Sequence, residues 1–308
     1  MKEWIKRNEM REMLVEIKPT NKQLCNWIEQ LVPKRDLYFV EDNDLTMLEG
    51  ELNEVLVIPV NEFYNHPSYR QIQLANSYTY WDISNKAEFV IVAQPSWITN
   101  LSKQSKKHLL KIQLMMGRGL IFPYSFFPPL SPIAQEHVVM KVREEQFVIL
   151  QYEMWNELPL DIKLRVIREY ALLWDSWSSY EVPSYTPNHI SRYANRFSDV
   201  PGSNCLSATL FAITKQDWIL DEWIHPETFK KGLEKASFIE TNSEFQKDDV
   251  VIWVNENHVI QHAAYHIGDN LFFNKNGQTV FNPWKIIHWN QLNKQWARYK
   301  KKIYRIKL

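Results

Sequence analysis

Residues 247–274 read KDDVVIWVNENHVIQHAAYHIGDNLFFN, and this stretch decides the fold of the C-terminal part of the chain. Its apolar runs are short and rich in β-branched and aromatic residues, which is typical of buried strands. Gly268-Asp269-Asn270 stands between two of these runs, where turn residues indicate a hairpin. We therefore expect strands over 250–253, 259–267 and 271–274, with the last two joined by this turn.

A second informative stretch lies upstream, where residues 201–212 read PGSNCLSATLFA. Cys205 follows a Pro-Gly turn and precedes apolar residues at helical spacing, which predicts a helix of about three turns beginning at Cys205. The dipole and the unpaired N–H groups at a helix N-terminus favour a thiolate. Cys205 is therefore the candidate nucleophile, and its backbone N–H would supply part of an oxyanion site.

A thiol nucleophile needs a neighbouring base, and histidine can accept and return a proton near neutral pH. His262 lies on the predicted strand 259–267, and a strand that crosses the face of the Cys205 helix would bring the two together. The hairpin would also fold Asn274 back beside His262, where an amide oxygen could accept from the imidazole and fix its tautomer. These residues form a candidate Cys-His-Asn site.

The order of these features resembles the NlpC/P60 family of papain-like cysteine peptidases. The resemblance rests on a cysteine at a helix start, then Asp-Asp-Val-Val-Ile-Trp, His-Ala-Ala-Tyr-His-Ile-Gly-Asp-Asn and Leu-Phe-Phe-Asn. It implies a papain-like domain, with a helix packed on an antiparallel sheet, in which Cys205 is the nucleophile, His262 the base and Asn274 the orienting residue. A tyrosine upstream of the cysteine often lines the family's active site, and Tyr193 corresponds to it.

The resemblance covers roughly residues 190–308, and the chain departs from the family pattern in several places. Asn204 replaces an aspartate before the cysteine, and Leu206-Ser207 replaces Ser-Gly after it. Ala264 and Asp248 stand where the family has glycines. The family's substrate specificity therefore does not transfer to this chain.

The first half of the chain carries mixed α/β patterns without a family resemblance. We expect helices over 4–17, 24–32, 69–75, 96–116 and 159–177, and a hairpin over 138–152. The apolar, β-branched runs over 55–60 and 89–92 predict buried strands at sheet centres. The sequence thus predicts the α+β class with two domains. They are a mixed α/β domain of unknown role over 1–177 and an NlpC/P60-like domain over 178–308.

Each site residue also has a simpler interpretation. Cys205 could be structural, Asn274 could support a turn, and His266 could be the base in place of His262. His258, His262 and His266 recur every four residues, which would form a metal-binding stripe on a helix, but the residues around them favour strands. We expect no metal or cofactor. Cys25 is expected to be a small buried residue inside the 24–32 helix.

Composition limits the function further. The formal net charge is zero, so nothing global indicates binding to nucleic acid or to an anionic membrane. Two cysteines in a chain of this size fit a reducing compartment. No signal sequence or membrane span is recognisable, which predicts a cytoplasmic protein, with release by lysis as a second route. The expected partner is a peptide or another amide substrate, and the sequence does not predict an oligomeric state.

The predicted function is a cysteine-dependent amide hydrolase that forms an acyl-enzyme, and the resemblance implies cell-wall-type peptides as substrates. Two alternatives remain open. The same site could transfer the acyl group to an acceptor other than water, which would make the protein an acyltransferase. The unusual residues around Cys205 could instead mark a catalytically inactive binding module.

Overall fold

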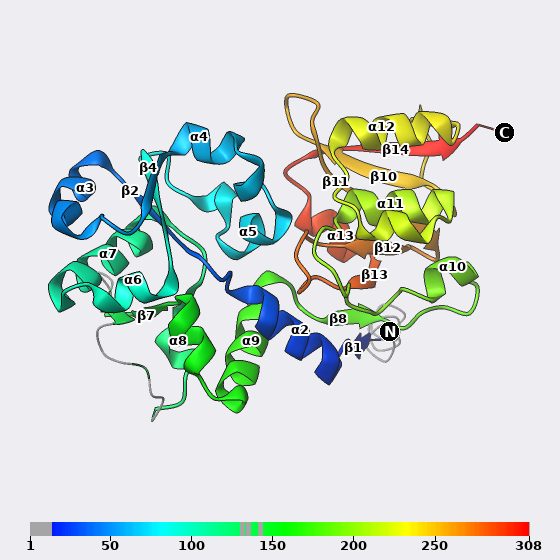
Figure 1. Ribbon diagram of the computed structural model, residues 1–308. Coiled ribbons are helices and arrows are strands. Elements are labelled where there is room, and N and C mark those ends of the chain that lie inside the picture. The colour runs from blue at the N-terminus through cyan, green and yellow to red at the C-terminus, as the bar shows by residue number, and fades with distance from the viewer. Residues whose placement is uncertain (1–13, 130–132, 134–136, 141–143, 308) are drawn as a thin grey trace. The chain divides into compact units, whose positions relative to one another are not determined.

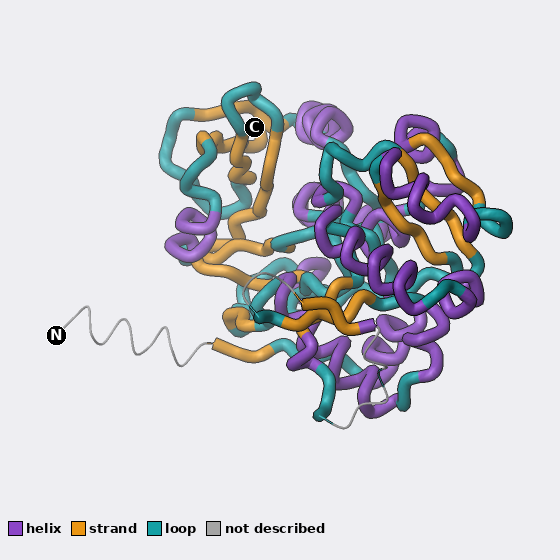
Figure 2. The backbone as a smooth tube through the Cα atoms, turned by 90° about the vertical axis from the view of Figure 1, so that its left-hand side faces the viewer, coloured by secondary structure: helices purple, strands orange, loops and turns teal. Residues whose placement is uncertain are grey.

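The computed structural model describes residues 14–129, 133, 137–140 and 144–307. The described chain divides into two compact units (Figure 1). The C-terminal unit comprises residues 14–23 and 171–307, and the N-terminal unit comprises residues 24–170. Helices and strands occur throughout the described chain (Figure 2), and each unit contains both. Every strand pairing among the described residues is antiparallel. The chain therefore has mixed helices and antiparallel sheets, as the α+β class requires.

The division between the units differs from the predicted boundary after residue 177. Strand β1 (Leu14–Glu16) pairs with β8 (Ser178–Tyr180), so the first described residues belong to the C-terminal unit. The second boundary lies inside helix α9 (Leu160–Trp174), between residues 170 and 171. A pairing between segments so far apart in sequence leaves no local signal.

The N-terminal helix predicted over 4–17 is wrong for its described residues, because residues 14–16 form β1. Residues 4–13 lie outside the described part of the chain.

A six-stranded antiparallel sheet is the centre of the C-terminal unit, with the strand order β13-β12-β11-β10-β14-β9. The strands are β9 (Phe238–Thr241), β10 (Val250–Val254), β11 (Ile260–Gly268), β12 (Leu271–Lys275), β13 (Trp284–His288) and β14 (Lys300–Ile306). The helices are α10 (Asn188–Ser191), α11 (Cys205–Thr214), α12 (Pro226–Lys235) and α13 (Trp289–Gln295). The predicted strands and the Gly268-Asp269-Asn270 turn are thus confirmed.

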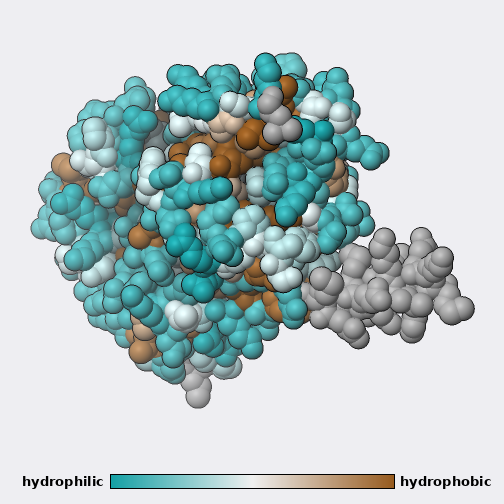
Figure 3. All heavy atoms as spheres, turned by 90° about the vertical axis from the view of Figure 1, so that its right-hand side faces the viewer, coloured by the Kyte–Doolittle hydropathy of each residue, from teal (hydrophilic) through white to brown (hydrophobic). Residues whose placement is uncertain are grey.

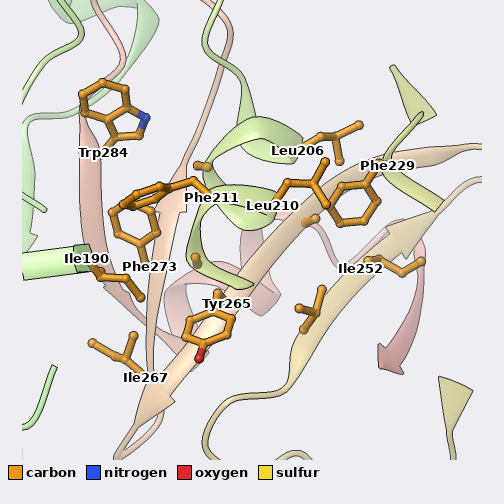
Figure 4. Packing of buried hydrophobic residues seen from close by; sticks show 14 of the residues in the cluster. Ile190, Leu206, Leu210, Phe211, Phe229, Ile252, Tyr265, Ile267, Phe273 and Trp284 are labelled. Atoms are coloured by element: carbon orange, nitrogen blue, oxygen red, sulfur yellow. The ribbon is translucent and has the colours of Figure 1, made fainter. Parts of the chain in front are cut away.

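One face of this sheet packs against α11 and α12. Leu206, Leu210 and Phe211 of α11 lie over Tyr265 and Phe273 of the sheet (Figure 4), in one hydrophobic cluster. Helix α11 is apolar on nearly all sides and buried from Leu206 to Ala212, as expected for a helix enclosed by other elements. The sheet and this helix therefore form one rigid support for residues at the helix N-terminus.

The other face of the sheet carries a smaller hydrophobic cluster around α13. Val251 and Trp253 of β10 belong to it, whereas Val250 and Ile252 belong to the α11 face, as side chains alternate along a strand. Trp253 pairs with His262 in the register of β10 and β11. His262 therefore points to the α13 face of the sheet.

The N-terminal unit contains two small sheets with the orders β2-β4-β3 and β5-β7-β6. Its strands are β2 (Asp36–Val40), β3 (Leu56–Pro59), β4 (Phe89–Ala93), β5 (Ile121–Pro123), β6 (Val138–Met140) and β7 (Gln146–Ile149). Its helices are α2 (Asn21–Leu31), which begins in the other unit, α3 (Asp42–Leu48), α4 (Val60–Asn65), α5 (Ile72–Ser77), α6 (Pro95–Asn100), α7 (Lys103–Met116), α8 (Tyr152–Glu157) and most of α9.

Two predictions for this unit need correction. The single helix expected over 96–116 is divided into α6 and α7, because Ser102 caps α7 by accepting from the backbone N–H of Ser105 at 3.0 Å. Helix α7 ends at Gly117, whose φ of 68° is the left-handed conformation that glycine adopts without strain. Strand β3 was expected at a buried sheet centre, but it is an edge strand with mostly exposed side chains.

Hydrophilic side chains cover most of the face shown in Figure 3, with smaller hydrophobic patches between them. Within the described ranges, no helix has both the length and the apolar character that crossing a membrane requires.

Candidate active site

Cys205 is the first residue of α11, as predicted, and a capping box fixes this helix start. Asn204 Oδ1 accepts from the backbone N–H of Ser207 at 2.9 Å, and Ser207 Oγ accepts from the backbone N–H of Asn204 at 2.9 Å. Gly202, with a φ of 128°, supplies the turn before the helix. Two of the departures from the family pattern, Asn204 and Ser207, thus form the cap of the candidate nucleophile.

The Cys205 thiol meets the sheet where β11 and β12 separate. The paired register of these strands ends at Tyr265 and Phe273. Backbone N–H groups alternate in direction along a strand. The backbone N–H of His266 donates to the carbonyl oxygen of Asp249, on the β10 side, at 2.8 Å. The N–H of Ala263 therefore points toward β12, and there it donates to the thiol of Cys205. The structure thus places the thiol against the residue that follows His262.

The thiol is not activated in the way that the sequence suggested. Burial raises the pKa of Cys205 to about 11, although the backbone N–H groups of Ala263, Leu206 and Cys205 and the charge of Lys275 act to lower it. The loss of solvent thus outweighs the helix N-terminus that was expected to favour the thiolate. The resting form of this cysteine is the neutral thiol.

His262 is buried and held between a polar and an aromatic partner. Its Nε2 lies 2.7 Å from Asn274 Oδ1, the contact that the hairpin predicted. The ring of Trp296 stacks on the imidazole, with ring centroids 4.1 Å apart and planes 10° apart. Trp253 lies against the same imidazole at 5.6 Å between centroids. These contacts fix the ring in position and keep water from its hydrogen bond with Asn274.

Burial also keeps the imidazole neutral. It lowers the pKa of His262 to about 3, against a smaller opposing effect of the hydrogen bond with Asn274. The structure therefore holds a neutral thiol at the backbone N–H of Ala263 and a neutral imidazole on the residue before it.

The lowered pKa of His262 makes the fold sensitive to acid. The unfolded chain binds a proton at this side chain below pH 6.5, whereas the folded chain does so only near pH 3, so stability falls as the pH decreases through this window. We expect this group to contribute a loss of roughly 2–3 kcal/mol between about pH 7 and about pH 4.5. Urea unfolding at both pH values measures it.

The matched variant for this prediction is His262→Gln, which keeps a neutral polar side chain without the titration. It should lose less stability than the unchanged chain over the same pH interval. Equal losses in the two proteins would show that His262 is not the group that titrates. His266, whose pKa is also lowered by burial, acts in the same direction and remains in both proteins.

The other sequence predictions have mixed outcomes. Tyr193, the candidate substrate-binding residue, packs its ring against Phe211 at 5.2 Å and Trp284 at 5.8 Å between centroids, and its binding role stays a prediction. His266, the alternative base, is buried against Phe245 and Phe272 of the hydrophobic cluster on the α13 face, and its role as a base stays untested.

Two further expectations concern metal binding and Cys25. His258 lies in the turn before β11 and His262 and His266 lie along the strand, so the three do not form a helical stripe. In the parts of the chain that the structure describes, no group of three or more His, Cys, Asp or Glu side chains could hold a metal ion. Cys25 is exposed rather than buried, because Leu24, Trp27, Ile28 and Leu31 form the buried face of α2.

Sequence reasoning missed the residues that surround the site. Trp296 carried no signal, because it follows α13 and reaches His262 only through the fold. Lys275 is fully buried, where Nζ donates to the carbonyl oxygens of Thr279 and Asn282, and burial lowers its pKa to about 7. Asn274, Lys275 and Asn276 directly follow an apolar run, and this was the one sign in the sequence that polar side chains gather here.

Comparison of the chain with models of known protein families, with curated proteins and with solved structures found no match.

Proposed function

We propose that the C-terminal unit is a cysteine-dependent amide hydrolase of the papain-like kind, with Cys205, His262 and Asn274 as its catalytic residues. The observation that carries the proposal is the buried pair of His262 and Asn274, joined at 2.7 Å and covered by Trp296, on a strand whose next residue, Ala263, donates its backbone N–H to the Cys205 thiol. The amide holds the imidazole in one orientation and the Trp296 ring shields it from water, which are the two supports that a catalytic histidine needs.

The chemistry follows from the protonation states. Because Asn274 Oδ1 can only accept, Nε2 of His262 carries the proton and Nδ1 keeps its lone pair. As the Cys205 sulfur attacks the substrate carbonyl carbon, Nδ1 takes the thiol proton, and the backbone N–H of Cys205 faces the developing oxyanion. The protonated imidazole then gives this proton to the leaving amine as the C–N bond breaks.

The thioester that remains is opened by water. His262 takes a proton from the water molecule as its oxygen attacks the acyl carbon, and it returns the proton to the departing sulfur of Cys205. The products are the carboxylic acid and the regenerated neutral thiol. Peptides with γ-glutamyl or D-amino-acid linkages are the substrate class that the NlpC/P60 resemblance implies.

The test uses p-nitrophenyl acetate, a small acyl donor that does not depend on substrate specificity. We expect acetylation of Cys205, measured as a thioester on the peptide containing this residue by mass spectrometry, followed by release of acetate. The Cys25→Ala variant removes the exposed second thiol and should behave like the unchanged chain. Acetylation confined to Cys25 would overturn the proposal. Added glycinamide, an ordinary primary amine, distinguishes hydrolysis from transfer, since a transferase would pass most of the acetyl group to this amine.

A further inference from the structure

The Asn274 amide is hydrogen-bonded at both of its ends. Its Oδ1 faces His262 Nε2 at 2.7 Å, and its Nδ2 donates to Asn276 Oδ1 at 2.6 Å. Asn276 Nδ2 in turn donates to Asp175 Oδ1 at 2.9 Å. A continuous chain of hydrogen bonds therefore joins the imidazole to a carboxylate that follows helix α9.

This carboxylate is held in place by a buried ammonium group. Lys285 Nζ lies 2.7 Å from Asp175 Oδ1 and also donates to Ser176 O at 2.8 Å. The two side chains are only 1% and 5% exposed, for Lys285 and Asp175 respectively. A carboxylate that is paired with an ammonium group can accept hydrogen bonds but cannot donate one.

An acceptor at one end of this hydrogen-bond chain sets the direction of every hydrogen bond in it. Since Asp175 accepts, Asn276 must turn its Nδ2 toward Asp175 and its Oδ1 toward Asn274. Asn274 must then turn its Nδ2 toward Asn276 and its Oδ1 toward His262. In the reverse direction, an amide oxygen and the carboxylate would face each other with no proton between them, which is costly for buried groups.

We propose that Asp175 and Asn276 are positioning residues that hold His262 in a single tautomer, with the proton on Nε2 and the lone pair on Nδ1. Neither residue touches the reacting atoms, and both act through Asn274. The inference rests on the proposed function for its catalytic meaning, because Nδ1 is the atom that would take the thiol proton. The tautomer itself is a property of the folded chain and can be measured without any substrate.

The experiment observes the ring nitrogens of His262 in the full ¹⁵N-labelled chain by long-range ¹H–¹⁵N correlation, with the signals assigned by their loss in His262→Gln. The unchanged chain should show a proton on Nε2 alone. Asn276→Ala interrupts the hydrogen-bond chain but leaves the ion pair of Asp175 and Lys285 intact. It should populate both tautomers, and equal populations would lower the rate of Cys205 acetylation about twofold.

Two further variants complete the test. Gln261 is next to His262 in sequence, but its side chain donates to Val259 O and is not part of the hydrogen-bond chain. Gln261→Ala should therefore leave the tautomer of His262 unchanged. Asp175→Asn places a group that can donate at the end of the hydrogen-bond chain. It should therefore also give mixed tautomers of His262 where the variant remains folded. Because Asn276→Ala does not disturb the buried charges, it decides the question if Asp175→Asn unfolds.

A proton on Nδ1 in the unchanged chain would overturn the proposal, and so would a single Nε2 tautomer that persists in Asn276→Ala. These outcomes are distinct from failure of the hydrolase proposal. A chain that never acetylates Cys205 can still show the expected tautomer, and a chain that does so can still lack the effect of Asn276.

Discussion

Replacing Cys205 with alanine is expected to lower amide hydrolysis by about 10⁴-fold or more, because removing the nucleophile of a concerted catalytic group abolishes nearly all of its contribution. The substitution deletes one sulfur atom at the first position of α11. The capping box of Asn204 and Ser207 does not involve the thiol and should keep the helix start in place. The measurement is release of the amine product, by mass spectrometry, from a panel of peptides with α-peptide, γ-glutamyl and D-amino-acid linkages.

Cys25→Ala is the matched control, since it removes the second thiol from an exposed position in α2 and should leave hydrolysis unchanged. Circular dichroism of Cys205→Ala should match that of the unchanged chain. Activity of Cys205→Ala above a tenth of the original would contradict a nucleophilic role for the thiol. If Cys205→Ala is inactive and Cys205→Ser retains measurable hydrolysis, the attacking atom is at this position.

The pKa of the thiol bears on how this experiment should be run. Because burial raises the pKa of Cys205 to about 11, hydrolysis should depend on His262 taking the proton during attack rather than on a thiolate already present. Reactivity toward small alkylating agents is therefore a poor measure of activity for this cysteine, as the exposed Cys25 can react faster without any catalytic role.

The parts of the C-terminal unit that the sequence predicts are those with local signals. The Gly268-Asp269-Asn270 turn and the apolar runs beside it determine the hairpin, and the hairpin alone brings Asn274 back to His262. The start of α11 at Cys205 follows from the turn before it and the apolar run after it. Each of these expectations depends on residues close together in sequence, and the structure has each element where the pattern placed it.

The support of the site could not be predicted, because it depends on contacts across long sequence separations. Trp296 reaches His262 from beyond α13, and Asp175 reaches Asn276 from the end of α9. Local patterns also do not distinguish edge strands from central ones, so β3 looked as buried as β4. Lys275 and Lys285 are fully buried, and no local pattern shows this, since lysine ordinarily prefers solvent.

Replacing Lys285 with methionine is expected to destabilise the C-terminal unit by about 3–5 kcal/mol, the usual cost of leaving one buried charge without its partner. Asp175 would keep its carboxylate next to Asn276 but lose the ammonium group at 2.7 Å. Thermal unfolding should show a decrease in Tm of roughly 10 °C for a unit of this size. The cost arises from the charge that remains and not from the shape of the side chain, since methionine fills nearly the same volume.

Two variants separate these causes. Lys302→Met removes a partner of Glu240 at the same distance, 2.7 Å, but in a pair that is partly exposed, so it should cost less than about 1 kcal/mol. The double variant Asp175→Asn with Lys285→Met removes both buried charges and should recover most of the lost stability. If Lys285→Met costs no more than Lys302→Met, the ion pair does not hold Asp175. The carboxylate that orients Asn276, Asn274 and His262 would then lack the fixed position that the proposed tautomer requires.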